Sequence, residues 1–284
     1  MKQNLLAIYI IAGILIIVGT ISYFLKSDNQ DYSDKIKVIK TFELPYALRE
    51  ISGISHINDS KIACIQDEEG VLFIYDLEKK DVVKEILFGP RGDYESIRII
   101  DSIAYVIESN GKLFKINNFE SDSRKIEIYK TGFNNKNDIE SLDFLKEKDI
   151  FLTIPKRQNL SDKSDDFIIY EINSKTYKVE KEPYFRMKVN DSIFQERESF
   201  FTKKHLNPSE LTIHPDTKEI YILDSKVPRL LILNPNGSFK NMYKLNPENF
   251  QQPEGLSFDS KGRMYISNEE SDFLKQNIQL VEWE

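Results

Sequence analysis

The sequence has few of the residues that disulfides, thiolate metal sites and nucleotide-binding loops require. Its 284 residues include one cysteine, one tryptophan, three histidines and 11 glycines. The single cysteine, Cys64, excludes an intramolecular disulfide and a site built from several thiolates, and its apolar neighbours predict a buried core residue. A Gly-x-Ser-x-Gly elbow and a glycine-rich phosphate loop are also absent, so the sequence offers none of the usual nucleophile or nucleotide motifs.

Concentrated positive charge is missing as well. The chain carries 46 acidic and 39 basic side chains, a formal net charge of −7, and no basic block or stripe. Proteins that bind nucleic acid show such a basic surface, so we expect no nucleic-acid partner. The histidines, at 56, 205 and 214, lack metal-ligand spacing, and we assign no catalytic residue.

The one long apolar run is Leu5–Leu25, which contains 21 residues and no charged side chain. A membrane-spanning helix needs about 20 such residues. We therefore predict a cytoplasmic tail at 1–4, an uncleaved signal anchor at 5–25, a polar tether at 26–35 and a folded domain at 36–284. The protein would be a single-pass plasma-membrane protein with that domain outside the cytoplasm. A cleaved signal peptide is the alternative, although no small-residue cleavage site is recognisable.

A short motif recurs along the rest of the chain. It is clearest at 252–258, Gln-Pro-Glu-Gly-Leu-Ser-Phe, and weaker copies lie upstream with steps of 43, 45, 69 and 45 residues. Aligning the copies places five residues at one equivalent position: Ser52, Glu95, Glu140, Ser209 and Glu254. A fixed period of this size indicates a repeat architecture. Turn signals divide each repeat into short strands, including 140–145 and 176–189 as the first and last strands of the third repeat.

The two ends of the repeat array are incomplete in complementary ways. The last repeat has only three strands, and an extra strand-like segment at 36–44 precedes the first repeat. A β-propeller closes when its N-terminal strand completes the C-terminal blade, which removes exposed sheet edges. We therefore predict an all-β, five-bladed β-propeller closed by an N-terminal strand. The step of 69 contains irregular stretches at 156–166 and 190–207. We expect a short helix or lid in the second stretch, and a sixth, degenerate blade is the alternative.

Acidic residues recur at one end of the predicted blades. The start of the first strand and the end of the second strand lie at the same end of a blade, and the first strand is innermost, so residues there should surround the mouth of the central tunnel. Seven carboxylates occupy these places: Asp67, Glu95, Glu108, Glu140, Asp224, Glu254 and Glu269. Like charges at close range need compensation, and calcium takes about 6–8 oxygen ligands, so we predict a calcium ion at the mouth. The alternative is that the acids accept backbone N–H bonds or pair with Arg49, Arg98, Lys156 or Arg157.

The repeat motifs resemble those of the SdiA-regulated (YjiK-like) family of bacterial β-propellers. The resemblance covers residues 41–284, and its motifs are Leu-Arg-Glu-Ile-Ser-Gly-Ile at 48–54, Asp-Tyr-Glu-Ser-Ile at 93–97, Asp-Ile-Glu-Ser-Leu at 138–142 and Gln-Pro-Glu-Gly-Leu at 252–256. NHL-repeat and gluconolactonase-type propellers are more distantly similar. The resemblance implies a membrane-anchored or exported five-bladed propeller with bound calcium. The chain departs from the family pattern at Ser96 and Ser141, where glycine is commoner, and at Lys156 and Arg157, where an acid is expected.

Two functions are consistent with an acidic tunnel mouth. We expect a binding or interaction module of the cell envelope, in which the ion fixes the loops and helps to dock a protein partner or a small anionic ligand. The rival is a metal-dependent hydrolase for a lactone or phosphoester, in which the ion polarises the substrate and Glu140 or Glu254 acts as the base. The rival requires an open coordination position and a deep polar pocket.

Overall fold

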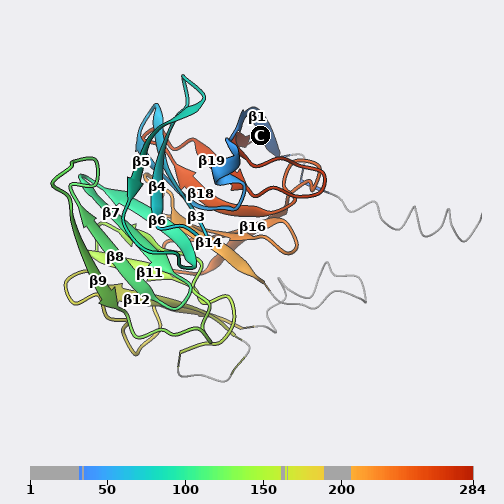
Figure 1. Cartoon of the computed structure of the whole chain (residues 1–284). Coiled ribbons are helices and arrows are strands. Elements are labelled where there is room, and N and C mark those ends of the chain that lie inside the picture. The colour runs from blue at the N-terminus through green and yellow to red at the C-terminus, as the bar shows by residue number, and fades with distance from the viewer. Residues whose placement is uncertain (1–31, 34, 161–163, 165, 189–205, 284) are drawn as a thin grey trace, which may run out of the picture. The chain divides into compact units, whose positions relative to one another are not determined.

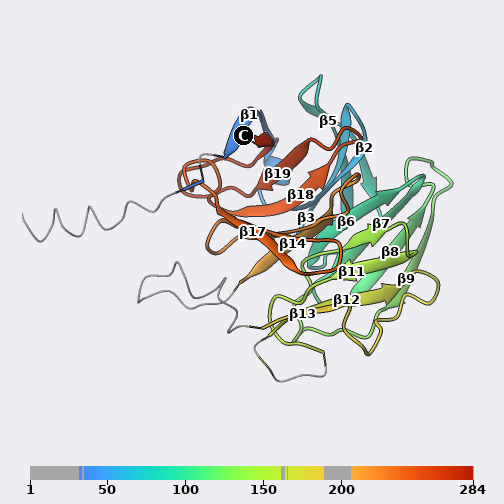
Figure 2. The ribbon, with the colours of Figure 1, turned by 180° about the vertical axis from the view of Figure 1, so that it is seen from behind.

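Five four-stranded antiparallel sheets form the part of the chain that the structure, a computed structural model, describes. The described residues are 32–33, 35–160, 164, 166–188 and 206–283. Figure 1 and Figure 2 show the sheets arranged as blades around a common axis. The first strands of neighbouring blades contact one another in a closed ring. The predicted all-β, five-bladed β-propeller is therefore confirmed.

Each blade runs from an innermost to an outermost strand. The first two blades contain β2 (Ile51–Asn58), β3 (Lys61–Gln66), β4 (Val71–Asp76) and β5 (Asp81–Leu87), then β6 (Tyr94–Ile100), β7 (Ile103–Glu108), β8 (Lys112–Asn117) and β9 (Lys125–Lys130). The third and fourth contain β10 (Asp143–Leu145), β11 (Ile150–Thr153), β12 (Phe167–Asn173) and β13 (Phe185–Met187), then β14 (Pro208–Ile213), β15 (Ile220–Asp224), β16 (Arg229–Leu233) and β17 (Phe239–Lys244). The fifth contains β18 (Pro253–Phe258), β19 (Met264–Asn268), β20 (Asn277–Trp283) and β1 (Ile36–Glu43), and the short 3-10 helix η1 (Tyr46–Leu48) leads from β1 to β2.

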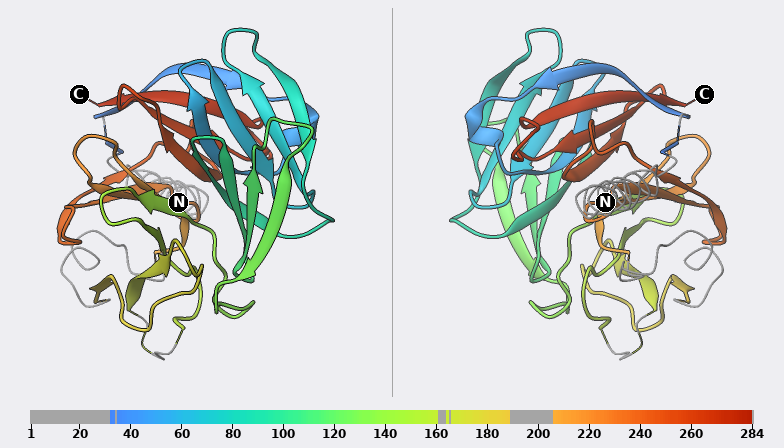
Figure 3. Two further views of the ribbon diagram at one scale, coloured as in Figure 1. Left: turned by 90° about the vertical axis from the view of Figure 1, so that its left-hand side faces the viewer. Right: turned by 90° about the vertical axis from the view of Figure 1, so that its right-hand side faces the viewer.

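The N-terminal strand closes the ring as predicted. Strand β1 pairs antiparallel with β20, with Ile36 opposite Trp283 and Phe42 opposite Ile278. Figure 3 shows the blue strand β1 running beside the red C-terminal strand. The closing sheet therefore joins the two ends of the domain, and β1 covers what would otherwise be the outer edge of β20.

The core lies between the blades. Five clusters of buried apolar side chains are each shared by two neighbouring blades, and Cys64 is fully buried in the cluster between the fifth and first blades. A strand that is covered on both faces reads as a continuous apolar run rather than an alternating one, as in β16, where all five residues are buried. The outermost strand β9 is exposed on alternate residues instead.

The third blade departs most from the predicted pattern. Its first strand, β10, begins at Asp143 rather than at 140, and its last strand, β13, has three residues. An isolated bridge between Ile172 and Val179 takes the place of the first part of the expected strand 176–189. Proline has no N–H to donate, and Pro183 lies between this bridge and β13, so the outer strand is interrupted.

Several predicted features lie outside the described residues. These are the cytoplasmic tail at 1–4, the signal anchor at 5–25, most of the tether at 26–35 and most of the irregular stretch at 190–207. Among the residues that are described, no helix combines the length and apolar character that crossing a membrane would require.

Candidate functional site

The equivalent position that the repeats share, occupied by serine or glutamate, lies at a β-bulge in four of the five blades. The first strand has one residue more than its partner at Ser52, Glu95, Ser209 and Glu254. A bulge interrupts the alternation of side chains and turns one of them in a new direction. The two serines use this direction to bond the next blade: Ser52 Oγ donates to the Tyr94 carbonyl at 2.7 Å, and Ser209 Oγ to the Pro253 carbonyl at 2.9 Å.

The three equivalent glutamates instead share the tunnel mouth. Glu95, Glu140 and Glu254 come from the second, third and fifth blades. Burial raises the pKa of Glu95 well above its usual range, and the charges of Glu140 and Glu254 raise it further. Burial and then the charge of Glu140 raise the pKa of Glu254, while a hydrogen bond from Ser225 acts in the opposite direction. The mouth therefore brings together acids that are 45 to 159 residues apart in the sequence.

A lysine lies among these acids. The Nζ of Lys156 is 2.6 Å from both carboxylate oxygens of Glu140, whose side chain is only 8% exposed. Burial raises the pKa of Glu140 to about 7 although Lys156 opposes the shift. Burial alone would lower the pKa of Lys156, but the charges of Glu140, Glu254 and Glu95 outweigh it and raise that pKa. Lys156 is therefore a charged ammonium group held inside the mouth.

Asp67 and Glu269 extend the mouth toward the first and fifth blades. Burial raises the pKa of Asp67 to about 6, with added effects of Glu50, Glu68 and Asp93. Burial raises the pKa of Glu269 to about 7, and the charge of Asp67 contributes. The Oδ1 of Asp67 is buried without a hydrogen-bond partner in the described part of the chain. Such an atom fits a bound proton or cation.

The remaining two predicted site residues have local partners. Glu108 Oε2 lies 2.6 Å from Lys112 Nζ, and Asp224 Oδ2 lies 2.7 Å from Arg229 Nε. Glu108 and Asp224 each lie opposite the residue just before the bulge on the neighbouring strand. In the first blade that place is taken by Gln66, and Asp67, which belongs to the mouth, is the next residue along the chain. A shift of one residue turns a strand side chain to the other face, so the structure brings five of the seven acids together and directs these two elsewhere.

The donors at the mouth match calcium in kind but not in placement. Carboxylate oxygens are the ligands that calcium prefers, and the Oδ1 of Asp67, which no described residue hydrogen-bonds, is consistent with a cation. Against this, the ammonium of Lys156 already contacts Glu140. No three Asp, Glu, His or Cys side chains within the described ranges lie close enough to hold a metal ion. An ion would require the glutamate side chains to move closer together.

Below the mouth, the tunnel is filled by charged side chains that the spacing of the repeats does not predict. Arg98 is 5% exposed and its Nε lies 2.8 Å from Asp143 Oδ1. Glu210 is fully buried and accepts hydrogen bonds from Ser96 Oγ at 2.9 and 3.1 Å. The mouth is therefore a shallow site. The sequence signal for Glu210 is an acid one position after the recurring Ser209, between that serine and the apolar Leu211.

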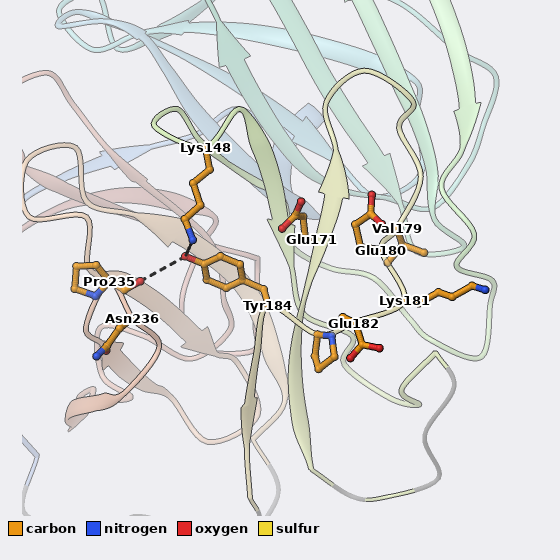
Figure 4. Close-up of a pocket in the computed structure, with 10 residues that line it drawn as sticks. Lys148, Glu171, Val179, Glu180, Lys181, Glu182, Tyr184, Pro235 and Asn236 are labelled. Atoms are coloured by element: carbon orange, nitrogen blue, oxygen red, sulfur yellow. Dashed lines mark hydrogen bonds between the residues drawn. The ribbon is translucent and has the colours of Figure 1, made fainter.

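The described residues also form clefts away from the five acids of the mouth, and these include two large ones. One cleft, of about 790 Å³, is formed by the third and fourth blades at the end opposite the mouth. In this cleft the Tyr184 hydroxyl lies 3.5 Å from both Lys148 Nζ and the Pro235 carbonyl oxygen (Figure 4). The other, of about 580 Å³, includes Gln252 and the 87% exposed Phe273. Because Gln252 Nε2 donates to Glu269 at 3.1 Å, the second cleft borders the mouth.

Comparison with known proteins agrees with this architecture. A model of the SdiA-regulated family matches residues 28–276. Similar solved structures include a streptogramin B lyase (13% identity, 88% of this chain and 98% of that chain, TM-score 0.50). A second is the PQQ-bound aldose sugar dehydrogenase of Streptomyces coelicolor, with 7% identity over 88% of this chain and 98% of that chain and a TM-score of 0.54. A third is the glutaminyl cyclase of Myxococcus xanthus, with 11% identity over 88% of this chain and 97% of that chain and a TM-score of 0.58. No curated protein sequence matches the chain. At these identities the structural likeness establishes the fold alone.

Proposed function

The chain belongs to the SdiA-regulated family, and we propose that it is a binding module whose ligand site is the acidic mouth of the propeller. The observation that carries this proposal is the convergence of Glu95, Glu140 and Glu254 from three blades around the ammonium of Lys156. Buried carboxyl groups at close range attract a positive charge from solution. Because side chains fill the tunnel below, the site suits surface recognition of a partner better than enclosure of a substrate.

The ion that we propose for this mouth is calcium. When all three have lost their protons, the glutamates would carry three negative charges against the single charge of Lys156, so two positive charges would balance them. Asp67, at the same mouth, adds a buried oxygen that has no hydrogen-bond partner among the described residues. A divalent ion that prefers oxygen ligands meets both needs, and it would give an otherwise acidic surface a point of attachment for a protein or a small anionic ligand.

Calorimetric titration of calcium into the full chain, solubilised in detergent and freed of metal, tests the proposal. We expect Glu95→Gln and Glu254→Gln to weaken binding at least tenfold, because each removes one charge from the mouth. Glu85→Gln is the matched control, since Glu85 is an exposed carboxylate on β5 in the outer part of the first blade. Absence of calcium binding by the wild-type chain, or equal loss in Glu85→Gln, would contradict a calcium site at the mouth.

We also propose that residues 5–25 anchor the chain in the plasma membrane and place the propeller outside the cytoplasm. The support is the uncharged run of 21 residues in the sequence, which is long enough to span a bilayer. Membrane fractionation of the full chain, followed by an alkaline wash, should leave the protein in the pellet. Recovery in the wash, or an N-terminus beginning after residue 25, would point to the cleaved signal peptide.

A metal-dependent hydrolase is the second candidate, and one observation favours it. The pKa of Glu140, raised to about 7 by burial, is suited to a general base near neutral pH. Lactone and phosphoester substrates should then be hydrolysed only with calcium present, and Glu140→Gln should abolish the turnover. The filled tunnel weighs against this function, because hydrolases usually hold their substrate in a deeper pocket.

A further inference from the structure

Arg98 lies where the five blades meet, and the proposed binding function does not use it. The side chain comes from the middle of β6 and is 5% exposed. Its guanidinium contacts one oxygen in every blade: it donates hydrogen bonds to the carbonyl oxygens of Ile54 at 3.0 Å, Ile97 at 3.0 Å, Leu211 at 3.1 Å and Leu256 at 3.5 Å, and its Nε forms an ion pair with Asp143 Oδ1 at 2.8 Å. Arginine alone among side chains offers five N–H donors in a planar, permanently charged group.

The residues equivalent to Arg98 explain why it fits. Counting three residues from the recurring position gives Ser55, Arg98, Asp143, Thr212 and Ser257 in the five blades. One large cation, one acid and three small hydroxyl residues therefore share this level of the tunnel. A long side chain at any second position would compete with Arg98 for the same space.

Two buried acids hold the guanidinium in place from other blades. Asp143 also accepts hydrogen bonds from Thr212 Oγ1 at 2.9 Å and from the Ile213 N–H at 2.6 Å. Glu210 lies 3.4 Å from Arg98 Nη2 and accepts a bond from the Leu142 N–H at 3.3 Å. Asp143 and Glu210 thus each join the third and fourth blades to one another and to the arginine.

We propose that Arg98 is the central clamp of the propeller: a built-in cation that joins all five blades at the axis and seals the tunnel below the mouth. Carbonyl and carboxylate oxygens converging on one positive centre form the kind of cage that proteins also build around free cations. Two consequences follow. A ligand enters and leaves the mouth from one side only, and an ion bound at the mouth affects recognition rather than closure of the ring.

Hydrogen exchange of the full chain distinguishes a five-blade clamp from an ordinary buried ion pair. In Arg98→Ala we expect amide exchange to become at least tenfold faster in all five innermost strands, β2, β6, β10, β14 and β18. The matched control is Arg229→Ala, because Arg229 is 4% exposed and pairs with Asp224 of its own blade. Its effect should centre on the fourth blade. Faster exchange confined to β6 and its direct neighbours in Arg98→Ala would overturn the proposal.

A second variant and a chemical probe apply if Arg98→Ala does not fold. Arg98→Lys keeps the charge but cannot reach five acceptors, so it should show the same five-strand pattern to a smaller degree. Millimolar methylguanidinium should restore the melting temperature, or the refolding yield, of Arg98→Ala without affecting the wild type. Exchange in Arg98→Lys equal to that of the wild type, or no response of Arg98→Ala to methylguanidinium, would show that the geometry of the guanidinium does not matter.

Discussion

The acids at the mouth predict an unusual pH dependence of stability, and Glu140 allows its size to be worked out. Burial raises the pKa of Glu140 from 4.5 to about 7. The folded state therefore keeps a proton to higher pH than the unfolded state, so stability from this group is present below about pH 4.5 and is lost as pH rises through 7. A shift of this size corresponds to about 3 kcal/mol, of which about 2 kcal/mol is lost between pH 5.5 and pH 8.

The neighbouring acids act in the same direction. Burial also raises the pKa values of Glu95, Glu254 and Glu269. Burial lowers the pKa of His56 to about 4 and also lowers the pKa of His214, so these two groups act in the opposite direction and offset part of the loss. We expect the acids to outweigh them, so metal-free protein should become less stable from pH 5.5 to pH 8. This is opposite to proteins whose carboxylates are stabilised in the charged form, which gain stability as pH rises to about 5 and keep it at higher pH.

Urea denaturation at pH 5.5, 6.5, 7.5 and 8.5 measures the effect. In Glu140→Gln, the free energy of unfolding should fall by about 2 kcal/mol less across this range than in the wild type. The reason is that glutamine does not titrate, while Lys156 remains charged beside Glu95 and Glu254. The exposed control Glu85→Gln should keep the wild-type slope. A wild-type stability that rises over this range, or a slope that Glu140→Gln leaves unchanged, would refute the placement of a buried, proton-binding acid at the mouth.

Three further predictions concern single residues. Lys156→Met should tighten calcium binding at least tenfold in calorimetry, since it removes a positive charge that lies 2.6 Å from Glu140; unchanged affinity would place the ion elsewhere. Burial raises the pKa of the Cys64 thiol, so a thiol reagent should label it only on unfolding, and rapid labelling of native protein would contradict its burial. Gly53→Ala should lower stability by about 2 kcal/mol in urea, because its Cβ would lie 2.8 Å from the Ser96 Cα; wild-type stability would show that the ring can shift.

The period of the repeats was sufficient to predict the ring and its closure. Steps of 43 and 45 residues and a last repeat one strand short are properties of the sequence alone, and pairing of β1 with β20 agrees with them. The third blade was harder to predict. A three-residue outer strand next to Pro183 carries too little periodic signal, and the positive backbone φ of 54° at Tyr177 is not visible in a pattern of apolar residues.

The direction of the side chains limits how far the residues of the candidate site can be predicted from the sequence. Equivalent positions in a repeat face equivalent places, so the spacing of the repeats predicts a common location for the recurring glutamates. Glu108 and Asp224 end their strands, yet each stands one residue before the position that faces the mouth. The bulge at Glu95 removes one residue from the pairing register, and a two-residue period read from sequence does not reveal such a shift. The position after the bulge, occupied by Glu210, points into the tunnel for the same reason.

Two nearby positions of the repeat have different roles: the position at the bulge forms the mouth, and the position three residues later forms the clamp. At the bulge, serine bonds the next blade, as Ser52 does to Tyr94, whereas glutamate at the equivalent place extends into the mouth. Three residues further on, Arg98 joins the blades at the axis. Because the clamp supplies cohesion at the axis, the bulge positions are free to carry charge that the fold itself does not need. Replacing Glu95 by serine should therefore preserve the ring while weakening any cation at the mouth, whereas no replacement of Arg98 should preserve the ring unchanged.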